Sequence, residues 1–297
     1  MTYYEFQTTT YGKWILAGEH AVLRGHSALV FPIKEKKLIF SYKPSDSELS
    51  ANYEGPNGAD MHLLFWSVLE QGQQLLGQSL NRLTGHFHLH CNIPVGVGMG
   101  ASAALCVAMA RWFAAQKLIT PETTSLFAKN LENLFHGKSS GLDIAGVSAE
   151  SGIAFKQGQV SPMVQKWKPV WYLSSCGQIG FTSHCINQVN QLWQSNSAQA
   201  EAIDLSMQDA VDKCRKALKE DYSPASLTLL SDAIQQAGQC FKDWGLISEN
   251  LGHHIQNLQN LGALAVKPTG SGGGGYVISL WESPPFVPAN LEWIPIS

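Results

Sequence analysis

The sequence predicts a protein of mixed helices and strands, folded as one large domain or as two ordinary ones. Its 297 residues allow either division, since a domain has about 150 residues. Strand-like runs and amphipathic stretches alternate in the first half, whereas helical stretches dominate the second half until two late strands. Hydrophobic residues make up 44% of the chain, which is enough for a sizeable core. We place a boundary near residue 165, giving an N-terminal domain (1–165) and a C-terminal domain (166–297).

The first half is expected to mix both kinds of element. Short runs rich in β-branched and aromatic residues predict strands, and apolar residues at helical spacing predict helices. In the helix that begins at Pro121, we expect apolar side chains such as Leu126 and Leu134 to face inward. The expected strands are 14–17, 28–33, 37–42, 86–91 and 152–155, and the expected helices are 61–69, 102–116 and the segment after Pro121.

The second half is expected to be mainly helical. A strand starts it near Val170, and a proline-containing tail, 284–297, ends it along the surface before a last short strand. On the late helix, His253 and His254 are expected at the surface. The expected helices are 182–195, 198–219, 224–240 and 248–261, and the expected late strands are 263–267 and 276–281.

Composition and charge exclude several classes of protein. The net charge is −3 and there is no Lys/Arg run, so we expect no nucleic-acid partner. No apolar run approaches the ~18 residues of a membrane helix, and the N-terminal residues do not resemble a secretory signal. The six cysteines are scattered, as is typical of reduced thiols in a cytoplasmic protein. His86, His88 and His90 are interpreted as a polar strand face rather than a metal site.

The first segment that indicates chemistry is PVGVGMGASAA, residues 94–104. An alternating strand leads into glycines at every second position, and a helix of small residues follows at once. Glycines allow close approach of the backbone to a ligand, and a helix N-terminus offers N–H groups to phosphate. The spacing fits neither the dinucleotide fingerprint nor the Walker A loop. A turn that serves only tight packing is the alternative.

The second segment is ENLFHGKSSGLD, which carries Glu132 and Asp143 on either side of a glycine-containing turn. Two carboxylates placed in this way can converge on one site. A kinase needs one carboxylate for magnesium and another near the accepting hydroxyl. The alternative is a solvated glutamate at a helix end and an aspartate that caps the next helix.

Two further segments lie near the ends of the chain. GKWILAGEHAVLRG starts with Lys13, a cation suited to phosphate or to a carboxylate, and places Glu19 and His20 at a strand end. KPTGSGGGGYVISLW holds four glycines between two strands, which suggests a backbone that lies against a ligand or another loop. The alternatives are a surface lysine in the first segment and a flexible hairpin in the second.

These four segments, in this order, resemble those of the GHMP kinases. Residues 94–104 are similar to the family's Pro-x-x-x-Gly-Leu-Gly-Ser-Ser-Ala-Ala phosphate loop. GEHAVLRG and the closing glycine segment are similar to those of mevalonate kinases within the family. The resemblance implies an α+β fold of two domains, an ATP-binding one and a ferredoxin-like one, with the active site in the cleft between them.

The resemblance also implies roles for individual residues. Asp143 matches the catalytic aspartate and Lys13 the lysine that compensates developing charge. Ser102 and Glu132 match the magnesium ligands. The implied ATP-binding residues are Gly96, Gly98, Met99, Gly100, Ala101, Ser102 and Ala103, and the implied substrate-binding residues are Glu19, His20, Asp143, Thr182, Gly270 and Ser271.

The implied activity is ATP- and magnesium-dependent phosphorylation of mevalonate in isoprenoid precursor synthesis, by a monomer or homodimer. Departures from the family pattern leave the acceptor open. Ala101 replaces a serine, Lys138 and Ser139 replace Asn-Pro, and Ser271 replaces an alanine. A phosphomevalonate kinase, a sugar kinase or a kinase with another acceptor is the alternative. A non-catalytic nucleotide-binding relative is less favoured, because Lys13, Glu132 and Asp143 are all present.

Overall fold

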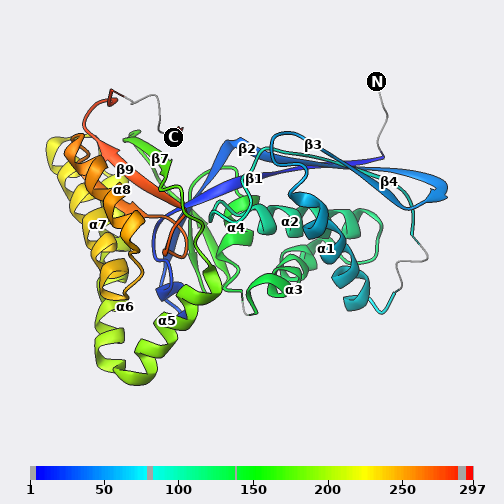
Figure 1. Ribbon diagram of the computed structural model, residues 1–297, viewed down its shortest axis with the longest axis horizontal. Coiled ribbons are helices and arrows are strands. Elements are labelled where there is room, and N and C mark those ends of the chain that lie inside the picture. The colour runs from blue at the N-terminus through cyan, green and yellow to red at the C-terminus, as the bar shows by residue number, and fades with distance from the viewer. Residues whose placement is uncertain (1–4, 79–82, 138, 287–291, 297) are drawn as a thin grey trace. The chain divides into compact units, whose positions relative to one another are not determined.

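The computed structural model describes residues 5–78, 83–137, 139–286 and 292–296, and its helices and strands are mixed along the chain as expected (Figure 1). The strands are β1 (Phe6–Ala17), β2 (Ala28–Glu48), β3 (Ser50–Glu54), β4 (Thr84–Cys91), β5 (Ile153–Lys156), β6 (Gln159–Pro162), β7 (Val170–Ser175), β8 (Ala265–Pro268), β9 (Tyr276–Trp281) and β10 (Trp293–Ile296). The α-helices are α1 (Met61–Leu75), α2 (Ala101–Ala115), α3 (Thr124–His136), α4 (Leu142–Ser148), α5 (Thr182–Ser195), α6 (Ser197–Lys219), α7 (Pro224–Asp243) and α8 (Glu249–Asn260). Two short 3-10 helices are η1 (Ala21–Arg24) and η3 (Pro121–Thr123).

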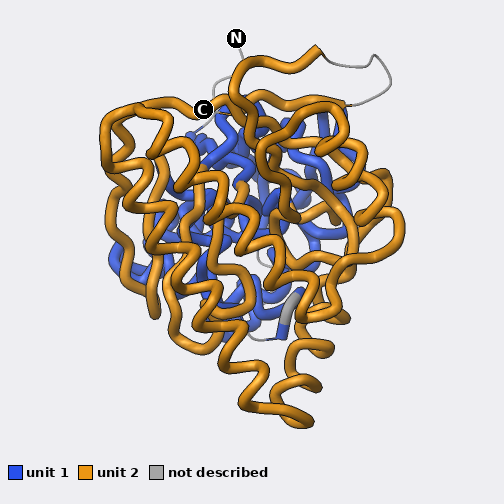
Figure 2. The backbone as a smooth tube through the Cα atoms, turned by 90° about the vertical axis from the view of Figure 1, so that its left-hand side faces the viewer, with its two compact units in different colours: residues 1–13, 32–95, 99–150 blue, residues 14–31, 96–98, 151–297 orange. Residues whose placement is uncertain are grey.

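The chain forms two compact units, and each is built from separated stretches of sequence (Figure 2). Unit 1 comprises residues 1–13, 32–95 and 99–150, and unit 2 comprises residues 14–31, 96–98 and 151–297. The chain therefore passes repeatedly from one unit to the other. The division into domains near residue 165 stays a prediction.

In unit 1, β4 pairs antiparallel with the second part of β2 and parallel with β3. Helices α1, α2 and α3 pack together beside these strands (Figure 1). Aromatic rings join the layers: the ring of Phe87 on β4 lies 5.1 Å from that of Phe65 on α1 and 4.9 Å from that of Trp112 on α2. Because α2 is rich in alanine and buried along most of its length, it can lie at the centre of this unit.

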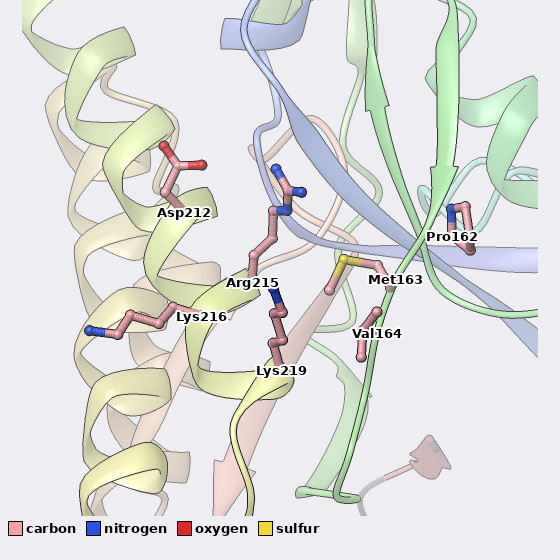
Figure 3. Close-up of a pocket in the computed structure, with 7 residues that line it drawn as sticks. All are labelled: Pro162, Met163, Val164, Asp212, Arg215, Lys216 and Lys219. Carbon is pink, nitrogen blue, oxygen red and sulfur yellow. The ribbon is translucent and has the colours of Figure 1, made fainter.

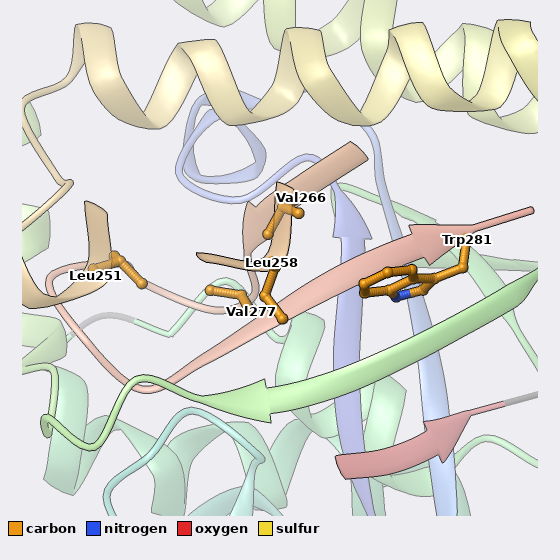
Figure 4. Packing of buried hydrophobic residues seen from close by; sticks show 5 residues of the cluster. All are labelled: Leu251, Leu258, Val266, Val277 and Trp281. Atoms are coloured by element: carbon orange, nitrogen blue, oxygen red, sulfur yellow. The ribbon is translucent and has the colours of Figure 1, made fainter. Parts of the chain in front are cut away.

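In unit 2, β10, β7, β9 and β8 form an antiparallel sheet in that order. Helices α7 and α8 pack against β8, and α6 packs against α7. Side chains from α8, β8 and β9 form one buried apolar cluster (Figure 4), whose members are Leu251, Leu258, Val266, Val277 and Trp281. Elsewhere in this unit, the start of β2 pairs with β5, which pairs with β6.

The strands differ from the expectation in three respects. The first strand was expected at 14–17, but β1 already begins at Phe6. Residues 28–33 and 37–42 were expected as separate strands but belong to one long strand, β2. The charged run 34–37 interrupts the apolar pattern but not the strand, and its side chains lie largely at the surface. Strands β3 and β6 were not expected, since neither buries an apolar face that a sequence pattern could display.

Two expectations about side-chain burial are wrong. Leu126 and Leu134 were expected to face inward, yet they are 60% and 45% exposed. Helix α3 instead buries the face that carries Leu131 and Glu132. His254 was expected at the surface but is buried, with Nε2 2.9 Å from the hydroxyl of Ser174 on β7, because this face of α8 packs on the sheet. Over the described ranges, no helix is long and apolar enough to cross a bilayer.

Candidate functional site

Lys13 and Asp143 form an ion pair within unit 1. Strand β1 carries Lys13, whose side chain is only 2% exposed, and its Nζ lies 2.8 Å from Oδ1 of Asp143. Asp143 lies in the first turn of α4. This helix begins directly after Gly141, which adopts a φ of 89°. Its side chain is 31% exposed, so this carboxylate can meet a ligand while the ammonium stays buried. The pair thus places the Asp143 carboxylate, which can accept a proton, beside the buried ammonium of Lys13.

Glu132 is the second carboxylate of unit 1, and it is buried rather than solvated. The hydroxyl of Ser139 donates a hydrogen bond to its Oε2. Its Oε1 is buried without a hydrogen-bond partner in the described structure. Burial raises the pKa of Glu132 to about 8, and the negative charge of Asp143 contributes to this rise, against the opposing effects of Ser139 and Lys13.

The glycine loop meets the start of α2 at Gly100, which adopts a φ of 81°. A Cβ at this position would lie 3.0 Å from Cγ of Lys13 and from a methyl of Val147, so the residue has neither the conformation nor the room for a side chain. The carbonyl of Met99 accepts a hydrogen bond of 2.9 Å from the backbone N–H of Lys13. The loop and the lysine are thus tied together inside unit 1.

The other residues that were expected to bind ATP are divided between the two units. Ala101 and Ala103 are buried in the first turn of α2 in unit 1, and Ser102 is half-buried between them. Gly96 and Gly98 belong to unit 2, both with positive φ. A Cβ on Gly98 would lie 3.4 Å from the carbonyl oxygen of Thr269.

Glu19 and Lys267 form a second buried ion pair, within unit 2. Nζ of Lys267 lies 2.6 Å from Oε1 of Glu19 and 3.3 Å from the carbonyl oxygen of Ile15. Neither side chain is more than 2% exposed. The hydroxyl of Thr269 accepts a hydrogen bond from the Ile15 N–H at 2.7 Å, so β8 and the segment after it are fastened to the end of β1.

His20 and Thr182 both contact Ser271. Nε2 of His20 donates to the carbonyl oxygen of Ser271 at 2.8 Å, and the hydroxyls of Thr182 and Ser271 are 3.2 Å apart. His20 has a φ of 59°, which is uncommon for a residue with a side chain. Burial lowers its pKa to about 4, so the ring is neutral at pH 7. Of the residues expected to bind substrate, these three come together with Gly270, the chain neighbour of Ser271.

The glycine run 272–275 is held against neighbouring loops. The N–H of Gly273 donates to Leu246 at 2.8 Å, and that of Gly275 donates to Gln178 at 2.6 Å. A Cβ on Gly275 would lie 2.9 Å from the carbonyl oxygen of Val97. The run is therefore an ordered connection that packs against other backbone, as one of the two interpretations expected.

Two residues of these networks were missed in the sequence. A single lysine inside the apolar strand β8, Lys267, was a usable signal, because a buried cation needs a partner. The role of Ser139 had no such signal, since its contact with Glu132 depends on the path of the intervening turn. Lys138, expected as an added cation, lies outside the described residues.

A separate cavity of about 390 Å³ lies in unit 2, away from all of the residues singled out in the sequence (Figure 3). Cationic side chains at the C-terminal end of α6 form one side, and the last residue of β6 and the two residues after it form the other. The lining residues are Pro162, Met163, Val164, Asp212, Arg215, Lys216 and Lys219.

The histidines of β4 make contacts across neighbouring strands. Nδ1 of His86 lies 2.9 Å from the hydroxyl of Ser50, and Nε2 of His88 lies 3.2 Å from a carboxylate oxygen of Glu54. In the part of the chain that is described, no three His, Cys, Asp or Glu side chains gather as they would around a metal ion.

The chain resembles kinases along most of its length. Residues 64–151 match the family model of the GHMP kinases N terminal domain. The mevalonate kinase of Thermococcus gammatolerans is 26% identical over 293 residues, covering 90% of this chain and 86% of that enzyme. The mevalonate kinase of Pyrococcus horikoshii is 27% identical over 180 residues, which cover 59% of this chain and about half, 53%, of that enzyme.

Solved structures share the fold. The L. major mevalonate kinase in complex with R-mevalonate superposes with a TM-score of 0.76 at 22% identity, covering 95% of this chain and 90% of that one. The Streptococcus pneumoniae phosphomevalonate kinase in complex with phosphomevalonate and AMPPNP superposes with a TM-score of 0.70 at 18% identity, covering 94% and 93%. The fold is the α+β fold of these kinases. The chain therefore matches the GHMP kinases over residues 64–151 and is similar to mevalonate kinases along most of its length.

Proposed function

We propose that the protein transfers the γ-phosphoryl group of ATP to the 5-hydroxyl of mevalonate, a step in isoprenoid precursor synthesis. The ion pair of Lys13 and Asp143 is the observation that carries this proposal, because it joins a base to a fixed cation at a partly exposed position. The mevalonate kinases aligned with up to 90% of the chain support the choice of acceptor. We also propose a cytoplasmic monomer or homodimer that needs neither nucleic acid nor a membrane.

In the proposed reaction, Asp143 receives the proton of the acceptor hydroxyl or orients that hydroxyl. The hydroxyl oxygen forms a bond to the γ-phosphorus while the bond to the β-phosphate oxygen breaks, and ADP leaves with the electron pair. Lys13 compensates the negative charge that develops on the transferred group. Positioning and charge compensation supply most of the catalysis in such transfers.

The residues of unit 1 fit a magnesium ion. Magnesium prefers oxygen ligands, and Glu132 holds one buried carboxylate oxygen that no described group hydrogen-bonds. We propose that this oxygen and the hydroxyl of Ser102 hold the ion together with oxygens of ATP. When bound, magnesium neutralises charge on the β- and γ-phosphates.

We propose that residues 96–103 surround the ATP phosphates, with the N-terminus of α2 offering its free N–H groups. The acceptor is proposed to meet Thr182, Gly270 and Ser271, along with Asp143. Glu19 and His20 are engaged by Lys267 and by the Ser271 backbone, so they support the substrate side by holding this segment in place.

The test is ADP release by the purified protein with magnesium-ATP and one acceptor at a time: mevalonate, phosphomevalonate, homoserine, galactose or glycerate. We expect turnover with mevalonate alone. Turnover only with phosphomevalonate would contradict the proposed acceptor and leave the kinase chemistry standing. No ADP release with any of these acceptors, while ATP still binds, would contradict the proposed function.

A further inference from the structure

We infer that Ser139 is a positioning residue for the magnesium-binding carboxylate of Glu132. Its hydroxyl holds one carboxylate oxygen and thereby leaves the other directed toward the metal. The inference rests on the proposed function, in which Glu132 is a magnesium ligand.

Three hydrogen bonds fix Ser139 in the turn between α3 and α4. Its backbone N–H donates to Oδ1 of Asn133 at 2.8 Å. Its hydroxyl accepts from the N–H of Gly141 at 3.0 Å and donates its single proton to Oε2 of Glu132. Ser139 is buried, so water does not compete strongly for these contacts. The hydroxyl is therefore a fixed donor.

The hydrogen bond from Ser139 makes the two carboxylate oxygens of Glu132 unequal. Oε2 accepts the hydrogen bond of Ser139, whereas Oε1 is buried and unpartnered in the described structure. An unpartnered carboxylate oxygen is costly inside a protein unless a ligand uses it. Because the carboxylate is held at Oε2, it cannot rotate freely about its last bond, and Oε1 keeps one direction.

Ser139 also couples this carboxylate to the second one. The hydroxyl of Ser139 accepts a hydrogen bond from the N–H of Gly141. Gly141 immediately precedes α4, and the first turn of α4 carries Asp143. One side chain thus contacts both the buried Glu132 and the backbone that leads to Asp143.

The contact makes a prediction about metal affinity. Residues that orient a metal-binding side chain typically change metal affinity by about 10- to 100-fold when they are removed. Without the hydroxyl, the Glu132 carboxylate loses its fixed direction, and Oε2 also loses its partner. We expect Ser139→Ala to weaken metal binding by about 10-fold, and Ser139→Thr, which keeps a hydroxyl, to retain most of the affinity.

The experiment measures Mn²⁺ binding in the presence of a non-hydrolysable ATP analogue, by the loss of the free-ion signal in electron paramagnetic resonance. Ser140→Ala is the matched control, because its hydroxyl lies in the same turn but accepts from the N–H of Leu142 at 3.1 Å. Glu132→Gln is the positive control. Analogue affinity without metal and the thermal midpoint are measured for each variant, so that a folding defect is recognised.

The expected result is weaker Mn²⁺ binding in Ser139→Ala, rescue in Ser139→Thr and no change in Ser140→Ala, with metal-free analogue affinity constant. Equal Mn²⁺ affinity in Ser139→Ala and the wild type, with Glu132→Gln impaired, would overturn the inference alone. Unchanged Mn²⁺ binding in Glu132→Gln would overturn both the inference and the proposed metal ligand. The assay contains no acceptor, so the choice of mevalonate does not affect it.

Discussion

Among the residues that the structure describes, two lysines are almost completely buried, and each lies beside a carboxylate. Lys13 pairs with Asp143, and Lys267 pairs with Glu19. The exposures of the partners differ, since Asp143 is 31% exposed and Glu19 only 2%. A carboxylate that reaches the surface can act on a ligand, whereas one enclosed with its cation serves the structure. We therefore propose that the first pair acts in the reaction and that the second stabilises the fold, although both join a lysine to a carboxylate.

Asp143→Asn tests the task of the first pair. The amide cannot receive the acceptor proton, so we expect turnover to fall by about 10²- to 10⁴-fold. Nucleotide affinity is expected to persist, because Asp143 is not among the residues proposed to surround the phosphates. ADP release under saturating substrates and binding of an ATP analogue measure the two effects. Near wild-type turnover would remove Asp143 from its proposed role.

His20→Asn tests the buried neutral imidazole. In the folded protein burial holds the pKa of His20 at about 4, against 6.5 when the ring is solvated. The unfolded chain therefore takes up this proton first, and stability falls as the pH drops from about 6.5 to about 4. Between pH 7.5 and pH 5 the wild type should lose about 2 kcal/mol more of its free energy of unfolding than the variant, as about 1.4 kcal/mol per pKa unit implies.

Asparagine is the chosen replacement because it tolerates the positive φ of residue 20 better than most residues. Urea unfolding at both pH values gives the comparison. If the free energy of unfolding falls equally in the wild type and in His20→Asn between the two pH values, His20 does not titrate as its burial implies.

At the scale of elements, the start of α2 depends on what lies beside it. Gly100 precedes the helix at a φ of 81° and faces the side chains of Lys13 and Val147. The helix itself was evident from its small residues, yet nothing in the sequence indicated what lies against its first turn. Close approach between β1, the loop and α4 explains why this position has no side chain.

Gly100→Ala should therefore destabilise the protein more than positive φ alone explains. Gly77→Ala is the matched control: its φ is 66°, but a Cβ there would meet nothing within 4 Å. Backbone strain should lower the free energy of unfolding of the control by about 1 kcal/mol. Gly100→Ala should lower it further, because Lys13 or Val147 must also shift. Chemical denaturation of both variants provides the measurement, and equal losses would contradict the close packing described for Gly100.

At the scale of the whole molecule, the order of the principal elements was predictable, and the partners of the buried charges were not. Helices α5 to α8 follow their sequence patterns because long amphipathic stretches display one period clearly. Strands β3 and β6 have no such pattern, since they bury no apolar face. The contacts of Lys267 and Ser139 arise only when distant or turning segments meet, so single-residue patterns do not reveal them.

The interleaved path of the chain also constrains the timing of folding. In unit 2 the rings of Trp14 and Phe31 stack 4.7 Å apart, and the ring of Trp171 lies 4.9 Å from Trp14 and 5.9 Å from Phe31. During synthesis, the first two aromatic residues leave the ribosome more than a hundred residues before the third. At about 5–20 residues per second, they wait for seconds without their native partner. The early apolar segment thus stays open to chaperones, and to aggregation, until the second half of the chain has been made.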